Sequence, residues 1–438
     1  MAHVAADRDA TRGTVHRGVP SGRLRARRPC VPTLIHAADG SAEVRGSRRR
    51  QTGAPRRPQW AAMATDWRGL RDRLIEEARR RGWAAAGVAS VRPMRQARER
   101  GLRALAEGRM EGMPWFTAER VEASTDLGGR YPWARSSLAL AWPYAPAAAP
   151  GDPVAAPTAE PGRPRGRMSA YACLPSGEGN DPADYHDVLG RRCDELVAWL
   201  REQVPEVRAK RFIDHGWAMD RAVAERAGIG FAGKNACLIT TEAGSYVLLA
   251  EVLLSLPLPP TPRSHRGCGT CSACLPSCPT GAIREPGVID ATRCISYLTI
   301  EHRGPIPEEL RPLIGTWAFG CDLCQEACPI NQRLAPIPLQ GGVATTTQGP
   351  VPFPDLVECL ELDEEAFRER FRRTAVWRAG RAGLARNAAI ALGNAGDRSA
   401  LPALRRARDG DPDAVVREAA DWAVQQVAGR QPVLATTD

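Results

Sequence analysis

The cysteines of this 438-residue chain are concentrated in two short runs. The first run has the spacing C-x2-C-x2-C-x3-C-P, and the second has C-x2-C-x3-C-P. The first run consists of Cys268, Cys271, Cys274 and Cys278, the second of Cys321, Cys324 and Cys328, and Cys294 stands alone between them. Where thiols bind metal, ligation replaces much of the apolar core that a segment of this size otherwise needs. This pattern therefore constrains the fold more strongly than the composition does.

The first run has the spacing of a bacterial ferredoxin site, in which three thiolates bind one cluster and the cysteine before proline binds its neighbour. That rule assigns one set of four ligands as Cys268, Cys271, Cys274 and Cys328. The other set is Cys278, Cys321 and Cys324, with Cys294 as the only remaining cysteine in the stretch to complete it. We therefore predict two [4Fe-4S] clusters in a ferredoxin-like module over residues 261–340.

Zinc and disulfides are the alternatives for these cysteines. Paired CxxC motifs also suit tetrahedral zinc, but three cysteines at successive three-residue steps followed by Cys-Pro fit zinc poorly. Disulfides need an oxidising compartment, and the chain shows no apolar export segment. It also has no apolar run of membrane-spanning length, so we expect a soluble, cytoplasmic protein without a membrane partner.

The formal net charge of +10 is concentrated at the N-terminus. Residues 1–62 contain thirteen arginines and four acidic residues, a net of +9, so the rest of the chain is nearly neutral. This opening stretch has no helical or strand period, and we expect it to be disordered. A targeting peptide or a twin-arginine signal is an alternative, but the residues after Arg28 are short and polar. The interpretation that we favour is a translation start at Met63, just before Asp66 caps an amphipathic helix.

Residues 63–260 alternate helical and strand patterns, which predicts an α/β domain. We expect helices over 66–82, 94–108, 184–203 and 218–227, and strands over 83–90, 136–144 and 210–213. The stretch 235–255 is predicted as a hairpin that turns at Ala243 and Gly244.

A linker rich in Pro, Gly and Thr precedes an all-helical region at residues 345–430. RAGLARNAAIALGNAG and PDAVVREAADWAVQQV recur about 32 residues apart, which is typical of HEAT-like repeats. A plain helical subdomain is the alternative. Two repeats are too few for an independent solenoid, so we expect them to dock on the preceding domain.

Asp214 lies where a predicted strand meets a loop, a usual position for a catalytic group in an α/β domain. Capping of the following helix is an equally good interpretation. Lys234 and Asn235, in the loop GIGFAGKN, are candidates to bind phosphate or amide groups, although Gly-Lys-Asn is also an ordinary turn. Cys173, His186 and His215 are isolated in sequence and fit structural roles better than ligation. DYHDVLG nearly matches a D-x-H-x-x-G cobalamin motif, but its glycine is displaced by one position, and we interpret the match as chance.

The chain resembles the epoxyqueuosine reductase family, from about Met63 to Val427. The resemblance rests on FIDHGWAMDRAVAERAGIGFAGKN, CGTCSACLPSCPTGAI, RCISYLTIEHRG, GCDLCQEACPIN and RNAAIALGN. It implies a cobalamin in the α/β domain beside the clusters and makes Asp214 the proton donor. The candidate cofactor contacts are Cys173, Lys234, Asn235, Ser296 and Tyr297. An insertion, CLPSGEGNDPA, leaves the role of Cys173 open, and Trp217 replaces a proline that is usual in the family.

The activity that the resemblance implies is the reduction of epoxyqueuosine to queuosine at the wobble position of tRNA. The reaction removes an epoxide oxygen as water and consumes two electrons and two protons, so an external one-electron donor must supply the clusters. Asp214 can donate a proton only if it is protonated at neutral pH, which burial would favour. We expect a monomer that binds the tRNA anticodon loop, with Arg378, Arg381 and Arg386 neutralising phosphates.

Three other functions remain open at this point. The first is a cobalamin-dependent, dehalogenase-like reductase of a small molecule. The second is a non-catalytic electron-transfer protein, and the third is an RNA-binding protein with purely structural clusters.

Overall fold

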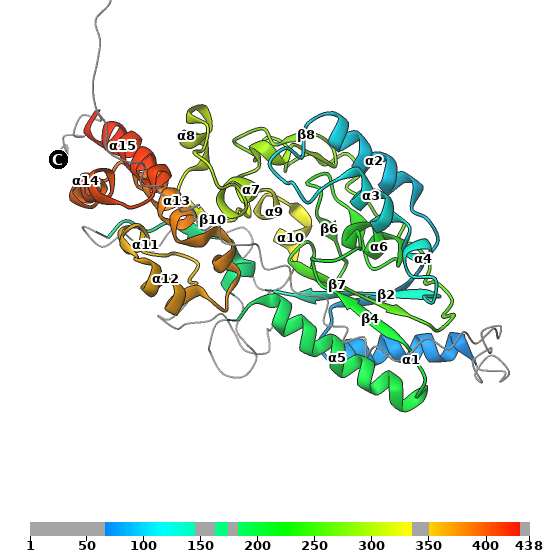
Figure 1. Ribbon diagram of the computed structural model, residues 1–438. Coiled ribbons are helices and arrows are strands. Elements are labelled where there is room, and N and C mark those ends of the chain that lie inside the picture. The colour runs from blue at the N-terminus through cyan, green and yellow to red at the C-terminus, as the bar shows by residue number, and fades with distance from the viewer. Residues whose placement is uncertain (1–65, 145–162, 174–182, 335–349, 430–438) are drawn as a thin grey trace, which may run out of the picture. The chain divides into compact units, whose positions relative to one another are not determined.

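The fold is built around a four-stranded sheet with the strand order β1-β2-β7-β4 (Figure 1). The strands are β1 (Ala85–Ser90), β2 (Ser136–Pro143), β7 (Val247–Leu254) and β4 (Ala209–Phe212). The computed structural model describes residues 66–144, 163–173, 183–334 and 350–429. The predictions for residues 1–62, for the insertion after Cys173 and for most of the linker before the C-terminal helices fall outside these ranges.

All three strand pairings in this sheet are antiparallel. The predicted hairpin over 235–255 is wrong, because β7 lies between β2 and β4 rather than against the segment before it. That segment forms β6 (Leu238–Ile239), which pairs with β5 (Phe231–Ala232) in a separate small sheet. The sequence VLLAEVLL is apolar at both odd and even positions, and such a strand needs neighbours and cover on both faces.

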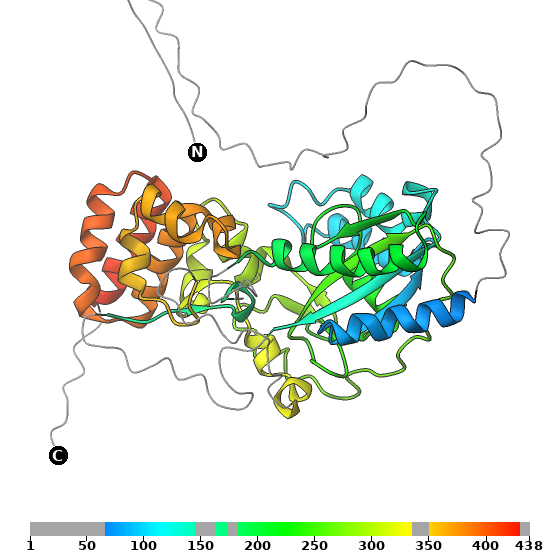
Figure 2. The same ribbon diagram turned by 90° about the horizontal axis from the view of Figure 1, so that it is seen from below.

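Helices cover both faces of the sheet (Figure 2). Leu138 and Leu140 of β2 pack in one core with α1 (Trp67–Arg80) and α5 (Tyr185–Gln203). Ala139 and Ala141 face the other way and pack with α6 (Asp220–Arg226). The period-two alternation of the strand separates these two cores. As predicted, Asp66 caps α1, accepting the Gly69 N–H at 2.9 Å.

Three further helices precede β2 in the chain. They are α2 (Arg95–Ala106), α3 (Ala118–Thr125) and α4 (Leu127–Arg130), and α3 packs against both of the others. None of the helices in the described part of the chain combines the length and apolarity needed to cross a bilayer.

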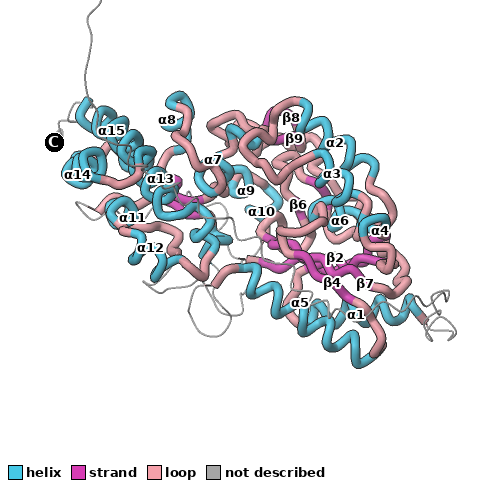
Figure 3. Tube along the Cα trace, in the orientation of Figure 1, coloured by secondary structure: helices cyan, strands magenta, loops and turns pink. Residues whose placement is uncertain are grey.

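The cysteine runs lie in a region of short elements and long loops (Figure 3). Its strands are β8 (Ile283–Glu285), β9 (Val288–Ile289) and β10 (Trp317–Phe319). Its helices are α7 (Ile295–Ile300), α8 (Arg311–Ile314), α9 (Leu323–Glu326) and α10 (Pro329–Arg333), with 3-10 turns at Ala291–Arg293 and Glu308–Leu310. β10 pairs in parallel with β3 (Arg167–Met168), and a 3-10 turn at Ala170–Cys173 follows β3. The chain before α5 therefore contributes a strand to this region.

The C-terminal region is all helix, as expected. It comprises α11 (Leu356–Glu361), α12 (Glu364–Phe371), α13 (Gly380–Ala395), α14 (Leu401–Gly410) and α15 (Ala414–Gly429), with 3-10 turns at Ala375–Ala379 and Arg398–Ala400. α13 packs against α11 and α15 on one side and against β10, α7 and α8 on the other. The expectation that these helices dock on the preceding region is confirmed, whereas the HEAT-like description stays a prediction.

Two arginines that we expected to bind phosphate are buried, and one of them, Arg386, makes the docking contacts. Arg386 is only 1% exposed, and its guanidinium donates to the backbone carbonyls of Leu298 (2.6 Å), His302 (2.9 Å) and Gly304 (2.8 Å). Burial lowers the pKa of Arg386 to about 10. Arg381 is also buried and forms a bidentate pair with a carboxylate, that of Asp411, at 2.8 Å. The phosphate-binding prediction is therefore wrong for Arg381 and Arg386.

We predict that Arg386→Met lowers the free energy of unfolding by about 3 kcal/mol, because one buried and two partly buried carbonyls lose their donor. Chemical denaturation measures this change. Arg405→Met, at an exposed position of α14, is the matched control and should stay within about 0.5 kcal/mol of the parent. Equal stability of the two variants would contradict the proposed docking role of Arg386.

Candidate functional site

Asp214 lies in a tight turn between β4 and α6. Its φ of 53° is in the left-handed region, which is uncommon for a residue other than glycine. Gly216 follows with φ 99°, and a Cβ there would lie 2.4 Å from the ring of Phe212. The turn leaves the side chain of Asp214 58% exposed. The protein's own side chains therefore do not supply the burial that we expected for this carboxyl.

Two residues from distant parts of the chain hold the carboxylate of Asp214. The hydroxyl of Tyr185, at the start of α5, donates to Oδ2. Nη1 of Arg378, from the 3-10 turn before α13, lies 3.7 Å from the same oxygen. Burial and the nearby charge of Asp214 raise the pKa of Tyr185 well above its ordinary value, so the phenol stays a neutral donor. The C-terminal region thus contributes a cation to the site.

Two histidines lie beside this group. The ring of His186 stacks on Tyr185 with centroids 4.1 Å apart and lies 5.2 Å from the ring of His215. Nδ1 of His186 is 2.6 Å from Oδ1 of Asp184, and Nη2 of Arg378 is 2.8 Å from that nitrogen. Burial lowers the pKa of His215, which favours the neutral ring at neutral pH. The string DYH, which we interpreted as a chance match, therefore lies at Asp214.

Aromatic rings and arginines also pack at the Asp214 turn. Nη2 of Arg120 donates to the carbonyl of Gly216 at 2.5 Å, and its guanidinium lies over the rings of Trp115 and Trp217. Arg130 lies 4.5 Å from the Trp217 ring centroid. Trp115 is 49% exposed, the most exposed large apolar side chain among the described residues. Trp217 replaces the expected proline and gives these arginines a ring to pack on.

The cysteines of the two runs form two groups. Burial raises the pKa of Cys274, and the charges of Cys268, Cys328 and Cys271 raise it further, so these four thiols lie close together. Burial raises the pKa of Cys321, and the charges of Cys294 and Cys278 raise it further. The pKa of Cys324 is raised first by a hydrogen bond with Cys237 and then by burial, with a contribution from Cys294. The four-and-four assignment of cluster ligands stays a prediction, and the thiol of Cys237 also lies at the second group, beside Cys324. Within the described residues, no three His, Cys, Asp or Glu side chains converge closely enough to hold a single metal ion.

Lys234 and Asn235 contact the cysteine runs. The N–H of Lys234 donates to Sγ of Cys268 at 3.4 Å, and its ammonium donates to the carbonyls of Gly269 (2.9 Å) and Cys271 (2.8 Å). The buried amide of Asn235 donates to the carbonyl of Cys324 at 3.3 Å. The GKN loop therefore joins both groups of cysteines, and both of its candidate residues are engaged there.

Ser296 and Tyr297 lie at Cys294, the residue that precedes α7. Burial raises the pKa of the Cys294 thiol, whereas the backbone N–H groups of both residues, which point at its sulfur, act in the opposite direction. Donors of this kind favour the thiolate and tune a metal centre that it binds. The hydroxyl of Ser296 donates to the carbonyl of Cys321 at 3.5 Å. The Tyr297 hydroxyl also packs against Gly112, where a Cβ would lie 1.8 Å from it.

Cys173 is buried at the end of a 3-10 turn, and burial raises the pKa of its thiol. The turn is fixed by Asp322, which accepts from the Ser169 hydroxyl at 2.6 Å and from the Ala170 N–H at 2.8 Å. Cys173 therefore lies near the second cysteine run in its neutral form.

Packed aromatic rings connect the Asp214 turn to the second cysteine group. The rings of Tyr185 and Tyr171 are 5.8 Å apart, and those of Tyr171 and Phe319 are 6.2 Å apart. Phe319 precedes Cys321 by two residues. The candidate proton donor and the predicted cluster ligands thus belong to one continuous packed structure.

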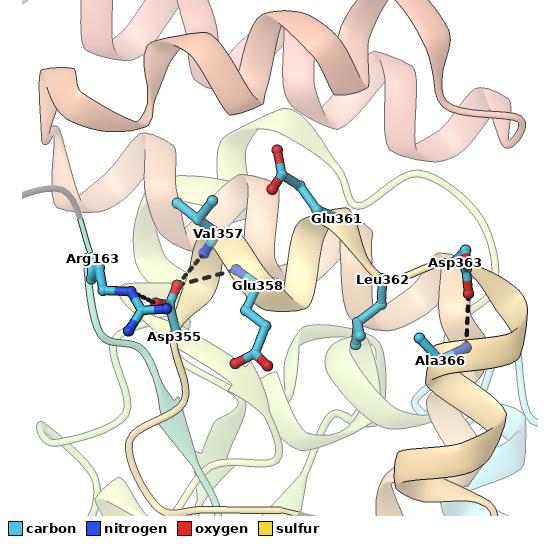
Figure 4. Close-up of a pocket in the computed structure, with 8 residues that line it drawn as sticks. All are labelled: Arg163, Asp355, Val357, Glu358, Glu361, Leu362, Asp363 and Ala366. Carbon is cyan, nitrogen blue, oxygen red and sulfur yellow. Dashed lines mark hydrogen bonds and ion pairs between the residues drawn. The ribbon is translucent and has the colours of Figure 1, made fainter. Parts of the chain in front are cut away.

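A pocket of about 360 Å³ lies elsewhere, along α11 and α12 (Figure 4). Its lining residues are Arg163, Asp355, Val357, Glu358, Glu361, Leu362, Asp363 and Ala366. It contains none of the predicted site residues, and its carboxylates would repel a phosphate.

The comparison with family models matches two parts of the chain. Residues 267–331 match the 4Fe-4S double cluster binding domain, which supports iron–sulfur clusters at the cysteine runs. Residues 125–215 match Epoxyqueuosine reductase QueG, DUF1730, a stretch that contains both Tyr185 and Asp214.

Curated relatives and solved structures are similar along most of the chain. An epoxyqueuosine reductase of Bacillus cereus is 33% identical over 366 residues, covering 83% of this chain and 90% of that protein. The Bacillus subtilis enzyme is 40% identical over 253 residues, and that match spans 62% of its length and 56% of this chain. In a Bacillus subtilis structure, 33% identical with TM-score 0.73, an aspartate-bearing catalytic loop is swung out of the active site; the match covers 83% of this chain and 91% of that one.

A further solved structure is an epoxyqueuosine reductase with an epoxyqueuosine-modified tRNA-Tyr stem loop. It is 33% identical with TM-score 0.72, and the match covers 83% of this chain and 91% of that one. Because the similarity to the Bacillus cereus protein spans nearly its full length, this chain belongs to the epoxyqueuosine reductase family.

Proposed function

We propose that this protein reduces epoxyqueuosine to queuosine in tRNA, with electrons supplied through two [4Fe-4S] clusters. The observation that carries the proposal is the exposed carboxylate of Asp214, held by Tyr185 and Arg378 and connected through packed rings to the second cysteine group. The proposal is supported by the tRNA stem loop bound in a related structure. Asp214 is then the catalytic acid, and the eight cysteines of the two groups are the cluster ligands.

Cobalamin is the further cofactor that we propose, bound in the region of residues 63–260 beside Asp214. The fit is supported by an exposed carboxylate in a strained turn, flanked by the half-exposed ring of Trp115 and by Trp217. A flat macrocycle beside these groups would be bordered by Tyr185 and the two histidines, which lie at Asp214. When bound, cobalamin supplies a reduced metal that accepts single electrons and holds the substrate while two of them arrive.

The chain's own residues supply protons and orientation. The hydroxyl of Tyr185 and the guanidinium of Arg378 fix Oδ2 of Asp214, so the remaining oxygen is available to carry a proton to the epoxide oxygen. We propose that bound substrate and cofactor cover the exposed face of Asp214, which would favour its protonated form. We further propose a cytoplasmic monomer that receives electrons from an external one-electron donor.

The tRNA is proposed to approach over the C-terminal helices, which also supply Arg378. Trp377, next to it, is 37% exposed and stacks on Phe367 with centroids 5.5 Å apart. An exposed ring with a fixed orientation offers a stacking surface for an unpaired base of an anticodon loop. A reductase of small molecules needs no such surface.

Asp214→Asn should reduce kcat by about 100-fold or more, because the amide keeps the shape of the side chain but cannot donate a proton to the oxygen. The measurement is mass spectrometry of tRNA nucleosides after anaerobic reduction of the reconstituted protein. Asp194→Asn, an exposed partner of Arg211, is the control and should leave the rate unchanged. Full turnover by Asp214→Asn would contradict the role of Asp214 as the acid. Persistence of the epoxide with the parent protein would contradict the proposed function.

Trp377→Ala should weaken binding of an epoxyqueuosine-modified stem loop by about 5- to 100-fold, the loss of one base–aromatic stack of about 1–3 kcal/mol. Fluorescence anisotropy with a labelled stem loop measures it. Trp115→Ala tests the exposed ring beside Arg120 in the same way. If neither change affects stem-loop binding while free epoxyqueuosine is still reduced, a small-molecule substrate is the better assignment.

Lys234→Met should shift the reduction potential of the first cluster to more negative values. The substitution removes a positive charge bonded to two carbonyls of the ligand loop, and a cation near a cluster favours the state with the extra electron. An electrochemical titration followed by electron paramagnetic resonance measures the shift. Arg293→Met, whose guanidinium donates to the Thr280 carbonyl beside Cys278, should instead affect the second cluster. An unchanged potential in Lys234→Met would contradict the placement of this cluster.

A further inference from the structure

Glu251 is a carboxylate in the interior of the central strand β7. It is fully buried, and neither of its oxygens accepts a hydrogen bond from a donor within the described residues. The register places it opposite Ala139 of β2 and Phe212 of β4, so its flanking partners are apolar. A buried carboxylate without donors is costly, and a stable strand would favour an apolar residue at this position.

The polar neighbour of Glu251 is Asp220, the first residue of α6, the helix that covers this face of the sheet. Two ionised carboxylates are acceptors only, so they cannot bond to each other. Once one of them holds a proton, that carboxyl becomes a donor, and a hydrogen bond joins the two side chains. The absence of any other donor for Glu251 therefore requires at least one proton on the pair.

The charges around the pair keep its protons available near neutral pH. Burial, and then the charge of Asp214, raises the pKa of Asp220 to about 7, and burial raises that of Glu251 well above its ordinary range. Arg221 acts against these effects at Asp220, and the charge of Arg120 reaches both Asp220 and Asp214. The charge of Glu251 also acts on the thiol of Cys193, which is neutral because burial raises its pKa.

The proposed reaction delivers two protons to one oxygen, whereas Asp214 carries only one. Its exposed face is where substrate and cofactor would lie, so the solvent route is closed during turnover. The charge of Asp214 acts on both Asp220 and Glu251, and Glu251 lies opposite Phe212, two residues before Asp214 in the chain. Asp220 itself is only partly buried, which gives the pair its own access to water.

We propose that Asp220 and Glu251 form a carboxyl pair that stores protons and returns one to Asp214 within each turnover. This inference rests on the proposed function. Asp214 gives its proton to the substrate oxygen and becomes a carboxylate. The pair passes one proton to that carboxylate, changing from two bound protons to one, and solvent restores the proton through Asp220. No electron moves in these steps, and both residues are positioning residues for the proton rather than groups that touch the substrate.

The pair can be tested without any activity by infrared spectroscopy. The reconstituted parent protein at neutral pH should show the carbonyl band of a protonated carboxylic acid, shifted in D2O. Glu251→Gln should lose it, and Asp220→Asn, which keeps the buried Glu251 carboxyl but removes its partner, should shift its frequency, whereas the surface control Asp194→Asn should leave it unchanged. A parent spectrum without this band, or an unchanged band in both amide variants, would overturn the proposal.

The contribution of the pair to the stability of the folded protein should decrease as the pH rises. The pKa of Asp220 in the folded protein, about 7, lies above its ordinary value of 3.8, so the stabilising contribution is complete below pH 3.8 and is lost as the pH rises towards 7. Between about pH 4 and 7 the Tm of the parent should therefore fall relative to that of Asp220→Asn. Parallel Tm curves for the two proteins would contradict the pair.

The kinetic test uses the tRNA substrate at saturating electron supply. Glu251→Gln should lower kcat by about tenfold or more with KM unchanged, whereas Asp220→Glu, which keeps a carboxyl at this position, should retain most of the parent rate. In the parent, kcat should decline as the pH rises through about 7, and Asp220→Asn should lose this limb. If Glu251→Gln lost the infrared band but kept full turnover, the pair would not return protons to Asp214. A band in a parent protein that leaves the epoxide intact would instead refute the proposed function.

Discussion

The pairing of β4 with β7 is the constraint on which the arrangement of the site depends. β7 lies between β2 and β4 and is buried on both faces, so its register fixes where β4 ends and where the chain turns at Asp214. The turn holds Asp214 in a left-handed conformation, at a strain of the order of 1 kcal/mol that the surrounding packing must hold. The same register places Glu251 opposite Phe212, the last residue of β4, where its side chain interacts with Asp220. One strand pairing thus positions both the exposed carboxylate and the buried pair.

Segments far apart in the chain complete the site. Tyr185 comes from the start of α5 and Arg378 from the turn before α13, and both reach Oδ2 of Asp214. Arg378 can do so because α13 is docked on the cysteine region by buried hydrogen bonds. Asn387 donates to the carbonyls of Thr299 (2.8 Å) and Ala318 (2.9 Å), alongside the contacts of Arg386. Buried polar groups with fully satisfied partners specify a single docking geometry, which an apolar contact would define less sharply.

The cysteine region shows how short elements are held in place. Its helices and strands are at most six residues long, and the ligand loops are fixed by side chains from outside the runs. Lys234 and Asn235 connect the two groups of thiols, and the first turn of α7 directs N–H groups at Cys294. These contacts join the predicted clusters to the sheet domain without a large shared apolar core.

Local patterns in the sequence were enough to predict the double cluster domain and most helices and strands, because spacing and period act over a few residues. The assignment of ligands to each cluster and the role of Asp214 stay predictions. A single glutamate, Glu251, within the apolar run VLLAEVLL indicates a buried carboxylate. Nothing in the sequence indicates that Asp220 is its partner. The hairpin expected over 235–255 failed because strand order is set by competition among segments distant in sequence. For the same reason only the tertiary structure showed that Arg381 and Arg386 are buried, that DYH lies at Asp214, and that Arg378 reaches it. Burial and long-range contacts depend on how the whole chain packs, which no local pattern encodes.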